Sequence, residues 1–303
     1  MWNALSIDVE EWFQVYNLSG ILSRDDWNTL PSRVEASTHT FLDLLDTHGA
    51  RATFFLLGWI AERHPDLVAE IAARGHEVAS HGYGHELLSH MDPESFHEDL
   101  SRTEDILEGI TGRKPSGYRA PSFSVGTGTL WALDVLLQRG YRYDSSIFPV
   151  SGRRYGHPAA PGRLHVARSR GTDRILWSFP LLTRRLLGVN LPLAGGGYLR
   201  FFPISWIRSG IHAMNQKGWP AMIYLHPWEL DPDHPVPGGL PFHRRFLHTV
   251  NLHRTGEKLA SLLRTFRFTT ASEALDSLVA ERPELEEEAP PAALFPGGDQ
   301  STR

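Results

Sequence analysis

Reactive side chains stand at five points along this chain, each directly after a short apolar stretch. They are Asp8 with Glu10, His81 with His85, Arg119, Asp144 and His226. The apolar stretches indicate buried strands, and parallel strands in α/β folds collect their active sites at the carboxyl ends. We therefore expect these side chains to meet in one site.

His81 and His85 have the spacing of metal ligands. Two imidazoles four residues apart reach one ion from a helical turn or a tight loop. Gly82 and Gly84 between them favour a loop. The alternative is two histidines on the surface or at a helix end, but the position directly after an apolar strand favours a metal site.

Asp8 and Glu10 are two carboxylates just past a strand. In extended backbone their side chains would face opposite ways, but a turn at the strand end brings both toward one site. One then binds a metal ion while the other acts as a base. The alternative is a solvated strand end followed by a helix cap.

Each of three further residues has two possible roles. Arg119 either forms a surface salt bridge or keeps a neighbouring acid ionised and oriented. Asp144 suits a plain turn as well as a catalytic role. His226 follows the apolar residues 222–225. It is either a core histidine with its hydrogen bonds satisfied or a general acid or base, because imidazole titrates near neutral pH.

Together these residues predict the hydrolysis of an amide. Two histidines and a carboxylate leave one position on zinc open for water. The ion lowers the pKa of that water and polarises the acyl carbonyl. A second carboxylate then accepts a proton from water, and a histidine on the other side protonates the leaving amine.

The elements that must position these residues alternate between strand and helix, which predicts a parallel sheet or barrel. Strands are expected at 4–7, 52–57, 77–79, 117–120, 141–143, 221–225 and 267–269, and helices at 31–46, 66–74, 93–110, 130–138, 203–216 and 256–265. Residues 150–204 break this rhythm, and we expect an insertion over the active-site face that shapes substrate choice. The folded domain spans residues 1–280, and the acidic, proline-rich residues 281–303 predict a disordered tail.

Composition excludes several classes of function. The 303 residues include no cysteine, which rules out disulfides, thiolate metal sites and a cysteine nucleophile. A net charge of −5 without a basic run argues against a nucleic-acid partner. The sequence contains no stretch of about 18 apolar residues, so no transmembrane segment is expected. No signal peptide is visible, so a cytoplasmic location is expected.

In order and spacing, these motifs resemble the polysaccharide deacetylases with a NodB homology domain, carbohydrate esterase family 4, across residues 5–227. The resemblance implies a distorted (β/α) barrel of about seven parallel strands. It also assigns a role to each matching residue: Asp8 as catalytic base, His81 and His85 as the metal pair, Arg119 with Pro121 as the R-x-P motif, Asp144 as the acid that orients the catalytic histidine, and His226 in Leu225-His226 as the general acid.

One motif departs from the family pattern. The family usually has two adjacent aspartates, whereas Val9 follows Asp8 here. A branch of the family spaces its acids as D-x-D, which implies Glu10 as the third ligand of a divalent metal, with zinc expected and Glu11 as the weaker candidate. Some relatives in that branch are metal-free hydrolases of cyclic ureides or imides. That activity is the alternative function, although retention of His81 and His85 argues against it.

Two stretches are similar to a narrower group. Ser6–Val15 and His226–His234 resemble deacetylases encoded with bacterial exopolysaccharide and exosortase systems. This resemblance implies a carbohydrate substrate on the route to exopolysaccharide and association with a membrane-bound assembly system. Trp228 and Tyr198 are candidates for stacking on a sugar ring, with core packing as the alternative. A catalytically inactive carbohydrate-binding module is the third hypothesis.

Overall fold

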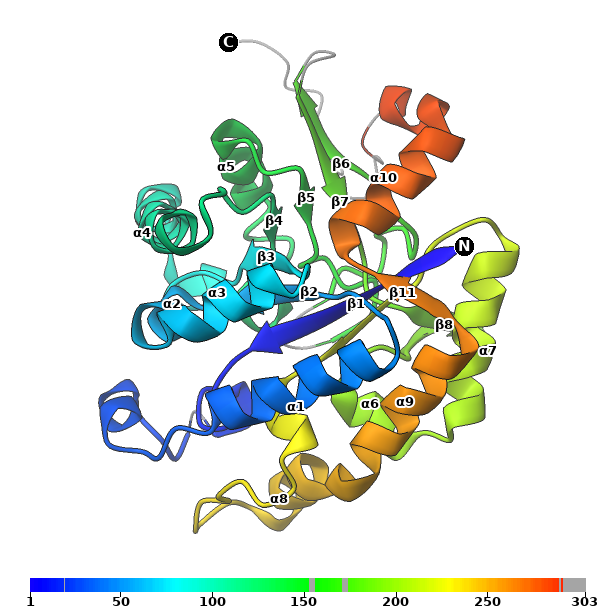
Figure 1. Ribbon diagram of the computed structural model, residues 1–303. Coiled ribbons are helices and arrows are strands. Elements are labelled where there is room, and N and C mark those ends of the chain that lie inside the picture. Colours follow the sequence, from blue (N-terminus) through cyan, green and yellow to red (C-terminus); the bar gives the residue numbers. More distant parts are fainter. Residues whose placement is uncertain (19, 153–155, 171–173, 289, 291–303) are drawn as a thin grey trace.

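The computed structural model describes residues 1–18, 20–152, 156–170, 174–288 and 290. One curled sheet organises this part of the chain (Figure 1). Its strands run in the order β10-β1-β2-β3-β4-β5-β7-β6, with β11 also paired to β1. Their bounds are β1 (Trp2–Val9), β2 (Thr53–Leu56), β3 (Glu77–Ser80), β4 (Gly117–Tyr118), β5 (Tyr143–Asp144), β6 (His165–Arg170), β7 (Arg174–Ser178), β10 (Met222–Leu225) and β11 (Arg267–Thr269).

The sheet is an open, distorted half-barrel. All pairings in it are parallel except that of β6 with β7. Ala4 pairs with both β10 and β11, which therefore lie on opposite edges of β1. Along one edge, β1 pairs first with β11 and then with β2, so the sheet divides there. Beyond β7, the amide of Leu182 donates to the carbonyl of Met222 at 2.9 Å, which joins the far side of the sheet to β10. The predicted barrel of parallel strands is confirmed.

Helices cover the outside of the sheet (Figure 1). They are α1 (Val34–Thr47), α2 (Gly58–Arg63), α3 (Pro65–Ala73), α4 (Pro93–Thr111), α5 (Trp131–Arg139), α6 (Gly196–Phe201), α7 (Ile204–Gln216), α8 (Phe242–Thr249), α9 (Thr255–Thr265) and α10 (Ala271–Glu281). In α4, Phe96 and Leu100 recur on one face and are fully buried. Asp92 caps the start of α4, and Gly112 ends it with a φ of 70°.

Residues 150–204 are only partly an insertion, which corrects the prediction. β7 pairs with β5 and belongs to the central sheet. The following segment forms a separate hairpin of β8 (Thr183–Leu186) and β9 (Val189–Pro192). The rhythm breaks because β6 pairs with β7 in antiparallel orientation, whereas the other neighbouring strands of this sheet are parallel.

Part of the predicted tail, residues 281–303, is ordered. Pro283–Glu287 form a 3-10 turn, and Leu285 is buried against the domain. Residues 289 and 291–303, on which the rest of this prediction falls, lie outside the described residues.

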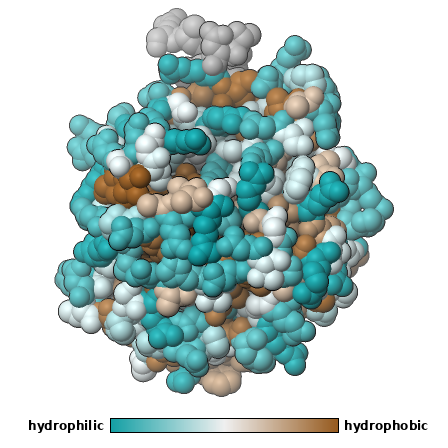
Figure 2. Space-filling model, in the orientation of Figure 1, coloured by the Kyte–Doolittle hydropathy of each residue, from teal (hydrophilic) through white to brown (hydrophobic). Residues whose placement is uncertain are grey.

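The face drawn in Figure 2 is mostly hydrophilic, with separate apolar patches. Among the described residues, no helix combines the length and apolar character needed to cross a bilayer.

Candidate active site

Asp8 and Arg119 form a buried ion pair at the carboxyl ends of β1 and β4. Asp8 is 2% exposed and Arg119 is fully buried. Arg119 Nη1 lies 2.5 Å from Asp8 Oδ1 and 2.9 Å from Ser6 Oγ. Its Nη2 donates to Ser145 Oγ at 2.8 Å, and its guanidinium lies over the ring of Phe55. These contacts lock Arg119, which in turn holds the Asp8 carboxylate in one orientation.

The loop from His81 to His85 folds back on itself directly after β3. Gly82 has a φ of 73°, and a Cβ there would lie 2.9 Å from an oxygen of Asp99. That carboxylate accepts the backbone N–H of Tyr83 at 3.0 Å. His85 itself has a φ of 56°. The reversal brings the two imidazoles to a ring separation of 5.6 Å, within reach of one ion.

Glu10 completes a cluster with these two histidines. Its Oε1 lies 3.0 Å from Nε2 of His81 and 3.0 Å from Nε2 of His85. The Nδ1–H of His81 donates to the carbonyl of Arg119 at 2.7 Å, which fixes the tautomer and turns Nε2 toward Glu10. Burial raises the pKa of Glu10. The contacts with His85 and His81 outweigh this effect, so the net pKa is well below its ordinary value. Two imidazoles and an ionised carboxylate fit the donor set of a zinc-type ion.

A second set of three groups shares Glu10. Oxygens of Asp8 and Glu10 and a ring nitrogen of His226 lie within 4.8 Å of one another. Asp8 is already paired with Arg119, however, whereas Nε2 of both His81 and His85 faces the Glu10 carboxylate. Glu10, His81 and His85 are therefore the better candidate metal centre, with Asp8 and His226 beside it.

Glu11 has a different partner from Glu10. Its carboxylate accepts the backbone N–H of Arg33 at 3.1 Å and of Val34 at 3.3 Å, and the hydroxyl of Ser32. Glu11 therefore stabilises the start of α1, where unpaired N–H groups favour an anion. Of the two adjacent acids, only Glu10 faces the histidines.

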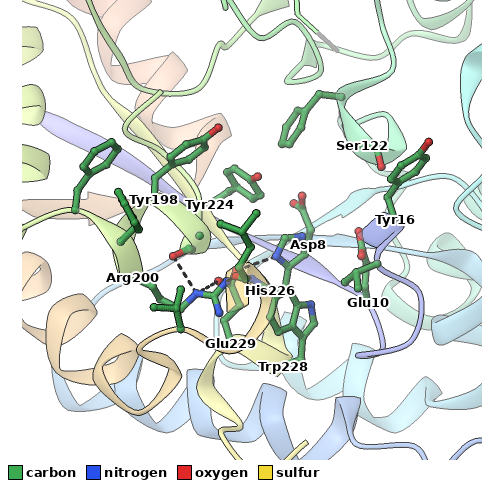
Figure 3. Close-up of a pocket in the computed structure, with 18 of the residues that line it drawn as sticks. Asp8, Glu10, Tyr16, Ser122, Tyr198, Arg200, Tyr224, His226, Trp228 and Glu229 are labelled. Atoms are coloured by element: carbon green, nitrogen blue, oxygen red, sulfur yellow. Dashed lines mark hydrogen bonds and ion pairs between the residues drawn. The ribbon is translucent and has the colours of Figure 1, made fainter. Parts of the chain in front are cut away.

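His226 follows β10 and contacts Glu229. Glu229 Oε1 lies 2.9 Å from His226 Nδ1 and accepts the His226 backbone N–H at 3.1 Å. The other carboxylate oxygen lies 3.2 Å from Nε of Arg200 (Figure 3). Burial lowers the pKa of His226, but Glu229, Glu10 and Asp8 raise it to a net value of about 9. The imidazole is therefore protonated at neutral pH.

Asp144 does not contact His226, which corrects the predicted pairing. Its carboxylate accepts the backbone N–H of Ser146 at 3.0 Å and the Ser146 hydroxyl. Ser146 Oγ in turn accepts the N–H of Ala120 at 2.7 Å, so Asp144 supports the segment that carries Arg119. An aspartate readily bonds to the backbone two residues ahead, and here that bond takes its oxygens. Burial raises the pKa of Asp144 to about 6.

A cavity opens above these groups, with aromatic walls. Among the residues that line it are Tyr16, Phe123, Tyr198, Phe202, Tyr224 and Trp228. The Trp228 indole stacks on the imidazoles of His226 and His248, with ring separations of 5.4 and 4.7 Å, and is only 6% exposed. The structure favours a packing role for Trp228. Sugar binding by Tyr198, which is half-buried in the cavity wall, stays a prediction.

Glu229 and Arg200 were not predicted to belong to the site. The Glu229 side chain is only 1% exposed. One signal was available: Glu229 stands three residues after His226, the spacing at which a helix-starting residue and an acid bond reciprocally. Arg200 offered no local signal because 28 residues separate it from Glu229 in the chain.

Two family matches divide the chain. Residues 22–143 match the polysaccharide deacetylase family, and residues 145–276 match a domain of unknown function, DUF3473. His81, His85 and Arg119 lie in the first segment and His226 in the second, while Asp8 and Glu10 precede both.

Curated relatives match over short stretches. A peptidoglycan-N-acetylglucosamine deacetylase of Bacillus cereus is 38% identical over 84 residues, which is 28% of this chain and 30% of that protein. A chitooligosaccharide deacetylase of Bradyrhizobium is 34% identical over 100 residues, covering 33% of this chain and 43% of that protein. This chain thus spans less than half the length of these relatives.

Solved structures share the fold over most of the chain. Peptidoglycan deacetylase PdaC of Bacillus subtilis aligns with a TM-score of 0.50 at 17% identity, covering 94% of this chain and 95% of that one. The allantoinase PuuE aligns with a TM-score of 0.59 at 16% identity, covering 92% and 90%. At these identities the likeness establishes the fold alone.

Proposed function

Because this chain contains a polysaccharide deacetylase domain of the NodB homology family, we propose that it hydrolyses the N-acetyl groups of amino sugars in a glycan. One observation carries the proposal. The Glu10–His81–His85 cluster, the Asp8–Arg119 pair and the protonated His226 converge on one cavity. The relatives named as peptidoglycan and chitooligosaccharide deacetylases support the choice of substrate class.

Asp8 and His226 divide the proton transfers between them. Asp8, held by Arg119, accepts a proton from the water whose oxygen attacks the acyl carbon. His226, which carries a proton at neutral pH, delivers it to the nitrogen as the C–N bond breaks. Acetate and a free amine are the products.

Glu10, His81 and His85 would hold a divalent ion, and we propose zinc. Such an ion supplies a Lewis acid that lowers the pKa of water and polarises the acyl carbonyl. The hydrogen bond from His81 Nδ1–H to the Arg119 carbonyl preorganises one ligand without the ion.

The biological setting is a finer part of the proposal. The resemblance of Ser6–Val15 and His226–His234 to exopolysaccharide-associated deacetylases supports a precursor of exopolysaccharide as the natural substrate. We also propose that the protein acts in the cytoplasm beside a membrane-bound assembly system. Cell fractionation with an antibody against this chain tests that location.

An acetate-release assay tests the proposed function. Protein purified without a histidine tag is incubated with N-acetylated chitooligosaccharides and peptidoglycan fragments, with and without a chelator. We expect acetate release that the chelator abolishes and zinc restores. Chelator-resistant hydrolysis of allantoin without acetate release would support the cyclic ureide hydrolase instead. Glycan binding without any hydrolysis would support an inactive binding module.

A further inference from the structure

Nδ1 of His226 is tied to two buried charged residues, Glu229 three positions later in the chain and, through Glu229, Arg200 of α6. Glu229 joins Nδ1 of His226 to Nε of Arg200, with contacts of 2.9 and 3.2 Å. Glu229 is 1% exposed and Arg200 is 3% exposed. Glu229 Oε1 is hydrogen-bonded to His226, and Oε2 makes an ion-pair contact with Arg200, so the buried carboxylate is held between two cationic side chains.

Arg200 is itself anchored by backbone carbonyls. Its Nη1 donates to the carbonyl of His248 at 2.6 Å and its Nη2 to that of Leu247 at 3.3 Å. Nε also donates to the carbonyl of Gly196 at 3.3 Å. The guanidinium is thus fixed from α6 and α8 together, and the position of Glu229 follows from that of Arg200.

The backbone at Gly196 leaves the space that the Glu229 carboxylate occupies. A Cβ built on Gly196 would lie 1.7 Å from Glu229 Oε2 and 2.0 Å from its Cδ. A Cβ on the neighbouring Gly197 would meet only Arg200 Nη2, at an ordinary 3.9 Å. Close approach to Glu229 therefore explains a glycine at position 196 and not at 197.

We propose that Glu229, anchored by Arg200 and accommodated by Gly196, is the positioning residue of His226: it holds Nδ1–H and leaves Nε2 as the proton donor of the reaction. The proposal rests on the deacetylase function proposed above. A carboxylate on one imidazole nitrogen fixes the tautomer and orientation of the ring, and stabilises its protonated form. Glu229 takes the place that Asp144 was expected to fill.

The proposal also gives the segment of residues 145–276 a role. His226, Glu229, Arg200 and Gly196 all lie in it, whereas the metal histidines lie in residues 22–143. The domain of unknown function thus provides the proton donor together with its support, and the preceding segment provides the two histidines of the metal site.

Three variants of the full chain test this inference. Glu229→Gln removes the charge while keeping the shape. Gly196→Ala keeps every charge but displaces the carboxylate. Gly197→Ala is the matched control. We expect the first two to lower kcat for an N-acetylated chitooligosaccharide by about 10²-fold, with KM and bound zinc little changed. Gly197→Ala should retain the wild-type kcat, and any effect of this substitution should appear in KM. A Glu229→Gln protein with full kcat would overturn the proposal.

A second measurement does not depend on activity. In protein labelled with ¹⁵N-histidine, the His226 ring signals are assigned by their loss in His226→Gln. Without substrate, we expect a downfield Nδ1–H proton that is lost or moved in Glu229→Gln and Gly196→Ala and kept in Gly197→Ala. If Glu229→Gln does not fold, the result for Gly196→Ala tests the proposal. Absence of the downfield Nδ1–H signal from the wild-type protein would by itself overturn the proposal. A chain that releases no acetate but shows this pattern would refute the deacetylase function and leave the Glu229–His226 assignment standing.

Discussion

At the scale of single residues, the adjacent acids Glu10 and Glu11 are both buried yet serve different partners. Glu10 turns to His81 and His85, and Glu11 turns to the first N–H groups of α1. Burial raises the pKa of Glu11 in spite of its hydrogen bonds, while the histidines bring that of Glu10 well below its ordinary value. Metal binding and helix capping are therefore separable by single substitutions.

Glu10→Gln and Glu11→Gln form a matched pair. Glu10→Gln should lose most of its bound zinc, because a neutral amide oxygen replaces the anionic ligand. Glu11→Gln should keep the metal and lose about 1 kcal/mol of unfolding free energy, because α1 loses the anion at its start. Metal analysis and urea denaturation measure the two effects. Equal zinc contents in both variants would contradict the assignment of Glu10.

Asp8 and His226 should be separable from the metal. Asp8→Asn and His226→Gln should each reduce the rate of acetate release by about 10²–10⁴-fold while zinc remains bound. The double variant should lose less than the product of the two factors, because the residues act in one reaction. Steady-state kinetics with metal analysis checks this. Loss of zinc alongside activity would instead indicate that these residues support the metal centre.

At the scale of elements, short loops after the strands place the reactive groups. The loop from His81 to His85 is held by the start of α2, since the N–H groups of Gly58 and Trp59 donate to the carbonyls of Gly82 and Tyr83, both at 2.9 Å. Asp99 of α4 holds the same loop through the N–H of Tyr83. Two helices thus stabilise the turn that brings the metal histidines together.

Gly82→Ala should therefore weaken metal binding. The φ of 73° at Gly82 costs a residue with a Cβ roughly 1–2 kcal/mol, and the added carbon would also press on Asp99. We expect a lower unfolding free energy and a raised zinc dissociation constant. Gly109→Ala in α4 is the control, because nothing lies within 4 Å of the added carbon there. It should stabilise the protein by up to about 1 kcal/mol and leave zinc affinity unchanged.

At the scale of the whole molecule, one sheet combines the two matched segments. β1, β2, β3, β4 and β5 are followed in the sheet by β7, while β10 lies on the other side of β1 and β11 pairs with the first residues of β1. The second segment therefore completes the half-barrel that the first begins. The fold also buries neutral histidines away from the site: His165, beside β7, is 2% exposed, and burial lowers its pKa to about 4.

Stability should fall on acidification because of such histidines. Between pH 6.5 and 4 the unfolded chain binds a proton at His165 that the folded chain does not, so the unfolding free energy decreases as pH falls. From pH 7.5 to 5 the expected loss at this residue is about 2 kcal/mol. Urea denaturation at both pH values measures it. His165→Leu should reduce the loss, whereas His253→Gln, at an exposed position, should not; equal pH dependence in wild type and His165→Leu would contradict the prediction.

Local patterns in the sequence determined the elements and most of the reactive residues. Apolar stretches located β1, β2, β3 and β10, and the acid and histidine spacing pointed to Asp8, Glu10, His81, His85 and His226. These signals are readable because each depends on neighbours a few residues away. Short helices such as α2 and α6 escaped because six residues show too little periodicity.

Only the tertiary structure decided which partner each reactive group has. Glu10 rather than Glu11 faces the histidines, and Glu229 rather than Asp144 holds His226. The contact of Glu229 with Arg200 joins β10 to α6, and that of Asp8 with Arg119 joins β1 to β4. Such pairs are set by the register and curl of the sheet, which bring together residues separated by tens of positions in the chain. No local sequence pattern predicts these long-range contacts.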